Sequence, residues 1–133
     1  MSSKFRFGER SLKNLSEVHA DLKRVAARAL ELSTVDFAVT DGLRTKEEQA
    51  ANLQKGVSQT KNSRHLTGHA IDIVAIVGGR ASWDYSLYQS IAAAFKAAAA
   101  GLGVDIEWGG DWKTLKDGCH FQLSRKSYPS ASK

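Results

Sequence analysis

Residues 70–77 read AIDIVAIV, an apolar run that holds a single charged residue, Asp72. A run of this length, ended by two glycines, predicts a strand buried inside a sheet. Side chains alternate along a strand, so Ile71 and Ile73 share one face while Asp72 points to the other. A carboxylate among buried neighbours has to be paired or bound to a cation. The chain therefore has to form a sheet that gives Asp72 a partner.

The remaining patterns predict helices beside short strands. Apolar residues recur at helical spacing over Ala20–Leu32 and over Tyr85–Leu102. Thr45 and Glu48 form a capping box, which predicts a further helix to about residue 55. Short strands are expected at Asp36–Thr40, Val104–Trp108 and His120–Leu123.

The composition is that of one folded domain. The chain has 133 residues, of which 42% are hydrophobic and 25% are charged, so disordered and fibrous classes are excluded. We expect a catalytic domain over residues 1–123 and a flexible tail over residues 124–133. A single cysteine, Cys119, excludes an internal disulfide framework. Stability must then come from the core, helped by a bound metal.

The net charge and the targeting signals limit the classes of partner. The formal charge of +5 favours polyanions, either nucleic acid or the anionic bacterial envelope, although a solvated basic surface without a partner fits equally well. The first residues, MSSKFRFGERSLKN, contain no apolar segment of a signal peptide, and no stretch is long enough to span a membrane. We therefore expect synthesis in the cytoplasm without an anchor.

Three side chains are candidate metal ligands. In residues 120–123 (HFQL), His120 and Gln122 share the face opposite to Phe121, so a neighbouring strand would bring His120 towards Asp72. His65 lies seven residues before Asp72, at the end of a polar loop. Two imidazoles and one carboxylate would leave a fourth zinc position open, as in catalytic sites. Spacing alone also allows a hydrogen-bonded core acid and two unrelated histidines.

Two motifs resemble those of a known peptidase family. Residues 63–72 (SRHLTGHAID) resemble the S-x-H-x-x-G-x-A-x-D signature of zinc D-alanyl-D-alanine carboxypeptidases and dipeptidases, and residues 117–120 (DGCH) resemble their D/E-x-x-H element. From residue 5 to residue 123 the chain is similar to the L-alanyl-D-glutamate endopeptidase endolysins of tailed bacteriophages. The resemblance implies an α+β fold with a small, mainly antiparallel sheet flanked by helices, like that of D-Ala-D-Ala peptidases and Hedgehog.

The resemblance also assigns the site. It implies that His65, Asp72 and His120 bind one catalytic zinc ion and that Asp117 transfers protons as general base and acid. The family also places an arginine near Arg44, which we expect to stabilise the tetrahedral oxyanion. A surface arginine at a helix start is the alternative for Arg44.

Five further residues are weaker candidates for substrate binding: Ser63, His69, Gln49, Trp108 and Asp111. Ser63 can equally form a turn, Gln49 can be solvated, and an aromatic side chain in a turn such as Trp108 often only packs. Gly68 and the following strand argue against a helical His65–His69 zinc pair. Cys119 points away from His120 in an extended segment, so we do not expect it to bind metal.

The sequence thus predicts a zinc-dependent endolysin that cleaves the L-alanyl-D-glutamate bond of peptidoglycan stem peptides during host lysis. We expect a monomer that is made in the host cytoplasm and is released through the inner membrane to the cell wall. The alternatives are a D,D-carboxypeptidase or dipeptidase and a non-catalytic zinc-stabilised binding module. A nucleic-acid partner is not expected, because the basic residues are spread over the chain without stacking aromatics.

Overall fold

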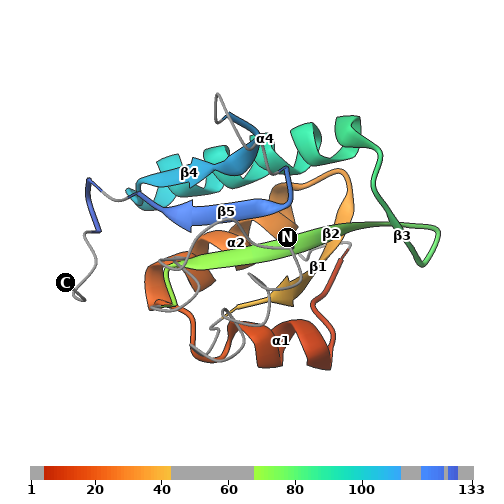
Figure 1. Ribbon diagram of the computed structural model, residues 1–133, viewed down its shortest axis with the longest axis horizontal. Helices are drawn as coiled ribbons and strands as arrows, with labels where there is room; N and C mark the ends of the chain where they lie inside the picture. The colour runs from red at the N-terminus through yellow and green to blue at the C-terminus, as the bar shows by residue number, and fades with distance from the viewer. Residues whose placement is uncertain (1–4, 43–67, 112–117, 125, 129–133) are drawn as a thin grey trace, which may run out of the picture.

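The computed structural model describes residues 5–42, 68–111, 118–124 and 126–128. Helices and strands are mixed along the chain, and Figure 1 shows the strands side by side with helices against them. The elements are α1 (Glu9–Leu15), α2 (Ala20–Leu32), β1 (Asp36–Asp41), β2 (Ala70–Val77), β3 (Arg80–Ser82), α4 (Tyr85–Leu102), β4 (Ile106–Trp108), η2 (Gly109–Asp111) and β5 (His120–Leu123). The predicted helices at 20–32 and 85–102 and the strand at 70–77 are confirmed.

The sheet is antiparallel at every described pairing. Its strand order is β1-β2-β5-β4, with β3 pairing separately with β2. β5 is therefore an inner strand between β2 and β4 although it is the last strand in the described sequence. The predicted α+β class with a small antiparallel sheet is confirmed.

β2 changes its partner halfway along one side. Its first half pairs with β5, up to Asp72 opposite His120, and its second half pairs with β3, from Ala75 opposite Ser82. Between them, the Ile73 amide donates to the Cys119 carbonyl at 2.9 Å. β5 begins at His120, and the gap begins after the opposed residue Asp72.

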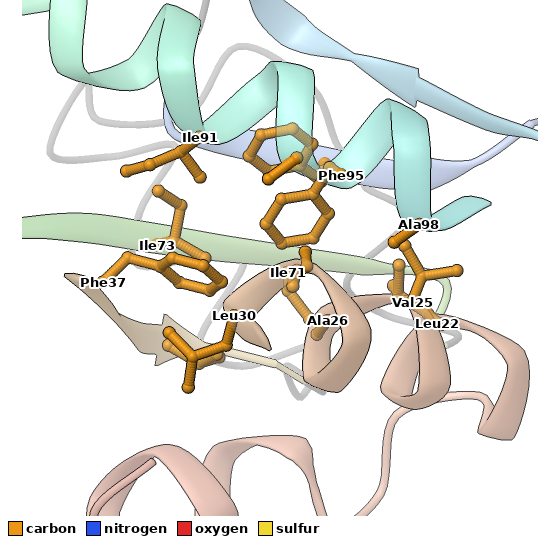
Figure 2. Packing of buried hydrophobic residues seen from close by; sticks show 14 of the residues in the cluster. Leu22, Val25, Ala26, Leu30, Phe37, Ile71, Ile73, Ile91, Phe95 and Ala98 are labelled. Carbon is orange, nitrogen blue, oxygen red and sulfur yellow. The ribbon is translucent and has the colours of Figure 1, made fainter. Parts of the chain in front are cut away.

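The hydrophobic core lies between one face of the sheet and the helices α2 and α4. Figure 2 shows Leu22, Val25, Ala26 and Leu30 of α2 and Ile91, Phe95 and Ala98 of α4 around Phe37, Ile71 and Ile73 of the sheet. The rings of Phe95 and Phe121 stack with centroids 3.9 Å apart and planes 11° apart. The residue after His120 is thus fixed by aromatic packing from behind the sheet.

Both long helices have defined ends. The His19 ring accepts a hydrogen bond from the Asp21 amide at the start of α2, and the Asp84 carboxylate accepts one from the Ser86 amide at the start of α4. α4 ends at Gly103, whose φ of 70° is the left-handed conformation that glycine adopts without a steric cost.

α1 lies along the edge strand β1. The Ser11 hydroxyl accepts a hydrogen bond from the Val39 amide at 3.0 Å, and the Asn14 side chain donates to the Val39 carbonyl at 2.8 Å. These contacts satisfy backbone groups that an edge strand would otherwise expose. Neither α1 nor β3 was expected from the sequence, and the strand predicted at 104–108 begins only at Ile106.

Two further expectations concern segments with few described residues. The helix predicted at 45–55 lies outside the described residues. In the predicted tail, the Tyr128 hydroxyl donates to Asp21 at 2.7 Å, while the tail's flexibility as a whole stays a prediction. Among the helices that the structure describes, none combines the length and apolarity needed to cross a membrane.

Candidate metal centre

Asp72 and His120 meet on the face of the sheet opposite to the core. They are directly opposed on β2 and β5, and the Asp72 Oδ1 atom lies 3.1 Å from the His120 Nδ1 atom. Ile71 and Phe121, their neighbours in sequence, are fully buried on the other face. The prediction that two strands would each contribute one ligand-type side chain and that these would meet is confirmed.

The pair is partly shielded from solvent. The exposed fraction of the side chain is 10% for His120 and 23% for Asp72. A histidine nitrogen and a carboxylate oxygen are two of the three donor types that zinc binds in proteins. The residual exposure on the Asp72 side leaves the pair accessible to an ion.

The spacing of the pair fits zinc. Two ligands on one tetrahedral zinc ion, each at about 2.0–2.1 Å, lie about 3.3 Å from each other. The separation of 3.1 Å between Oδ1 and Nδ1 is close to that value without any movement of the strands. Because a chemically suitable donor pair stands at this spacing, these residues fit the zinc ion that the motifs imply.

Gln122 and Glu107 extend the polar row across the sheet. The Gln122 Oε1 atom lies 2.8 Å from His120 Nε2, and the Gln122 amide donates to Glu107 Oε1 at 3.2 Å. Glu107 on β4 is directly opposite Gln122 on β5. Sequence reasoning placed Gln122 on the face of His120 but gave it no function, and it missed Glu107. A polar side chain two residues from a ligand in a strand was the available signal.

Several predicted site residues cannot be placed. His65, Asp117, Arg44, Ser63 and Gln49 lie outside the described residues. Within the part of the chain that the structure describes, there is no group of three metal-ligating side chains. The assignments of His65 as third ligand, of Asp117 to proton transfer and of Arg44 to oxyanion stabilisation therefore stay predictions.

His69 lies just before β2 and is not part of a helix. The preceding Gly68 has a φ of 73°, and its carbonyl accepts a hydrogen bond from the His19 amide at 2.8 Å. A side chain at residue 68 would also come within 2.9 Å of the Glu17 carbonyl oxygen. The ring of His69 lies 5.5 Å from that of His19. Because His65 lies outside the described residues, the expectation that Gly68 and the strand prevent a helical His65–His69 pair stays a prediction.

Trp108 packs into the core side of the sheet. It is 7% exposed, and the centroid of its ring lies 6.1 Å from that of Tyr85 and 6.4 Å from that of Phe121, with the rings stacked. Its indole N–H donates to the Gly118 carbonyl at 2.7 Å. This location favours the packing alternative. Its contribution to substrate binding stays a prediction.

Asp111 is exposed and forms an ion pair with Lys96 at 2.8 Å. The ammonium group of Lys96 also lies 5.3 Å from the centre of the Trp108 ring. A contact between Asp111 and a substrate amine would compete with this ion pair, and it too stays a prediction.

Cys119 is partly buried and packs against the core cluster. Its neighbour Tyr88 bridges the strands, because its hydroxyl donates to the Ser82 carbonyl at 2.6 Å and accepts from the Ala75 amide. Burial raises the pKa of Tyr88, and the nearby Cys119 thiol adds to this effect. Tyr88 thus stays neutral and fixes the point at which β3 replaces β5 beside β2.

Comparison with known proteins identifies the family. The model of the phage L-alanyl-D-glutamate peptidases matches residues 1–128. The chain is 38% identical over 128 residues to the L-alanyl-D-glutamate peptidase of Escherichia phage T5, with 93% of both chains covered. It is 40% identical over 124 residues to the L-alanyl-D-glutamate peptidase of Listeria phage A118, and this match covers 90% of the chain but 42% of that relative.

A solved structure agrees with these sequence matches. The crystal structure of the Serratia marcescens L-Ala D-Glu endopeptidase ChiX matches with a TM-score of 0.89 at 50% identity, over 96% of both chains. This match confirms the fold that the motifs implied. The range matched by the family model, residues 1–128, contains Asp72 and His120, the pair that meets across β2 and β5. This chain belongs to the phage L-alanyl-D-glutamate peptidase family.

Proposed function

We propose that this chain is a zinc-dependent endopeptidase that hydrolyses the bond between L-alanine and D-glutamate in peptidoglycan stem peptides. Family membership supports the reaction, and the names of the relatives support the bond. The observation that carries the proposal is the opposed pair Asp72 and His120, which presents two zinc-type donors 3.1 Å apart. The rigid strands and the stacked Phe121 behind them support a preorganised site.

The proposed site divides the chemistry among five residues. Asp72 and His120 hold the ion together with His65. Zinc, when bound, supplies Lewis acidity to the scissile carbonyl and to the attacking water. Asp117 takes the proton from that water and passes it to the departing amine of D-glutamate. Arg44 places a fixed positive charge beside the oxyanion that forms between these steps.

The remaining candidates have subordinate roles in the proposal. His69, three residues before Asp72, lines the approach to the ion, and Ser63 and Gln49 contact the substrate or support Arg44. Trp108 contributes an aromatic wall for the substrate, and Asp111 contributes an anionic contact for the amino group of the stem peptide. These roles have less support than those of the ligands. Packing in the core also accounts for Trp108, and the ion pair with Lys96 also accounts for Asp111.

The setting follows from the family and the charge. We infer that the protein is made in the host cytoplasm, is released through the inner membrane during lysis and acts on the cell wall as a monomer. Its charge of +5 favours association with the anionic envelope and assists encounter with the substrate. Neither nucleic acid nor a membrane anchor has a role in this proposal.

The test is digestion of purified sacculi, with zinc supplied and the new ends identified by mass spectrometry. We expect new amino-terminal D-glutamate. Release of free D-alanine instead would indicate a D,D-carboxypeptidase, and zinc binding without any new end would indicate a binding module.

Two variants sharpen this test. Asp117→Ala is expected to keep zinc and lose turnover, whereas His120→Ala should lose both. Glu31→Gln is the control, because Glu31 is an exposed carboxylate on α2 that pairs with Arg28. An Asp117→Ala protein with the turnover of Glu31→Gln would contradict the choice of proton carrier.

A further inference from the structure

Gln122 is a buried amide with a partner on each of its polar atoms. It is 3% exposed. Its Oε1 atom lies 2.8 Å from His120 Nε2, and its Nε2 atom donates to Glu107 Oε1 at 3.2 Å. Burial of an amide is tolerated when both ends are satisfied in this way.

The orientation of this amide is determined by Glu107. A carboxylate only accepts hydrogen bonds, so the donating NH₂ group of Gln122 has to face it. The carbonyl end of the same amide then faces His120 Nε2, where it can only accept. A flipped amide would place its oxygen against the carboxylate of Glu107 and its NH₂ group against the ring nitrogen.

This arrangement selects one form of the His120 ring. An acceptor at Nε2 favours a proton on Nε2, and in the neutral ring the lone pair is then on Nδ1. Nδ1 is the nitrogen that lies 3.1 Å from Asp72 Oδ1. The donor nitrogen is thus directed towards the carboxylate that would share the ion with it.

We propose that Gln122, itself oriented by Glu107, is a positioning residue that fixes the tautomer and the ring angle of His120 for metal binding. The row Asp72, His120, Gln122 and Glu107 crosses three neighbouring strands, and both opposed pairs are in register. Because the row is built on strands, the hydrogen bonds are maintained without loop ordering. The inference rests on the proposed zinc site and adds two residues that act through His120.

The expected effect is on metal affinity. Loss of an outer partner of a ligating histidine weakens metal binding by about 10–100-fold. Gln122→Met keeps the length of the side chain but removes the acceptor, so we expect a loss in this range. Glu107→Gln keeps the acceptor and removes only the group that orients it, so a smaller loss is expected. In the double variant Gln122→Glu with Glu107→Gln, a carboxylate at position 122 accepts from His120 and an amide at position 107 donates to that carboxylate. This variant should recover most of the zinc affinity.

The experiment is a competition titration of zinc against a chromophoric chelator with the metal-free 133-residue chain. Gln89→Met, at an exposed position on α4, is the matched control for Gln122→Met, and Glu31→Gln is the control for Glu107→Gln. Long-range ¹H–¹⁵N spectra of the histidine rings give an independent readout. In Glu107→Gln, the share of His120 with its proton on Nδ1 should rise, an effect that a general loss of packing would not produce.

The outcomes separate the two proposals. Weaker zinc binding in Gln122→Met together with recovery in the paired exchange supports the inference. Wild-type affinity in a folded Gln122→Met protein, or an unchanged His120 tautomer in Glu107→Gln, overturns it while the zinc site stands. If Gln122→Met does not fold, the Glu107→Gln spectra and the paired exchange decide. Absence of zinc binding by the wild-type protein overturns the proposed site and this inference together.

Discussion

Replacement of Trp108 by phenylalanine tests whether this residue supports the turn that leads to His120. The change removes the N–H that donates to the Gly118 carbonyl at 2.7 Å and part of a ring that is 7% exposed. Gly118 lies two residues before His120, so the hydrogen bond connects β4 to the start of β5. The phenylalanine ring still reaches towards Tyr85 but cannot replace the donor.

The magnitude follows from the two losses. The hydrogen bond and its unsatisfied carbonyl account for about 1 kcal/mol or more. The missing ring atoms, roughly three of carbon size, account for about 2 kcal/mol at about 0.8 kcal/mol each. For 133 residues, the unfolding entropy is about 0.28 kcal/mol/K. A total of about 3 kcal/mol therefore lowers Tm by about 10 °C.

The assay is thermal unfolding followed by far-UV circular dichroism on the metal-free protein. Trp83→Phe is the control, because Trp83 is 75% exposed and the chemical change is the same. We expect the control to stay within about 0.5 kcal/mol of the wild type. A Trp108→Phe protein that melts together with the control but loses hydrolysis would refute the packing argument and favour Trp108 as a substrate contact.

Three further predictions concern the metal, acid stability and a helix end. Asp72→Asn should abolish most of the rise in Tm that zinc gives to the wild-type protein; an equal rise in both, measured by differential scanning fluorimetry, would exclude Asp72 as a ligand. The hydrogen bond from Tyr128 lowers the pKa of Asp21. The ionised Asp21 carboxylate therefore stabilises the protein fully above about pH 4, and this stabilisation is lost as the pH falls through the lowered pKa. Asp21→Asn should then make Tm fall less steeply with decreasing pH. An unchanged acid limb in the plot of Tm against pH would contradict this. Gly103→Ala should lower the free energy of unfolding by about 1 kcal/mol, because residue 103 has a positive φ. Gly101→Ala should raise it by about 0.5–1 kcal/mol, because residue 101 lies inside α4 with open space at its Cβ position. Equal effects of the two variants in urea unfolding would contradict the conformational argument.

The long, periodic elements could be predicted from the sequence. The apolar run of β2 and the helical pattern of α4 extend over enough residues for their bounds to be recognised, and both match the structure. α1 was missed because it has only seven residues and its Leu12 is 56% exposed, so its apolar face is too short to give a pattern. β3 has three residues, and pairing with β2 rather than any preference of its own makes it a strand.

The same distinction applies to the site. Alternation within β2 and β5 placed Asp72 and His120 on the polar sides of their strands, and two motifs then suggested that they meet. The contact between Gln122 and Glu107 could not be predicted, because it depends on the register between β4 and β5. Register is set by the whole sheet and by the Trp108 ring stacked on Phe121, which no local pattern reveals.

The inner position of β5 has a consequence for the order of assembly during synthesis. The strand that carries His120 enters between β2 and β4, and its contact with Asp72 spans 48 positions of sequence. A nascent chain that has not yet exposed residues 120–123 has neither the second donor nor the strand that closes the sheet. Such long-range closure is slow compared with the formation of α2 or α4. We therefore expect the proposed metal centre to form late in folding, after α2 and α4.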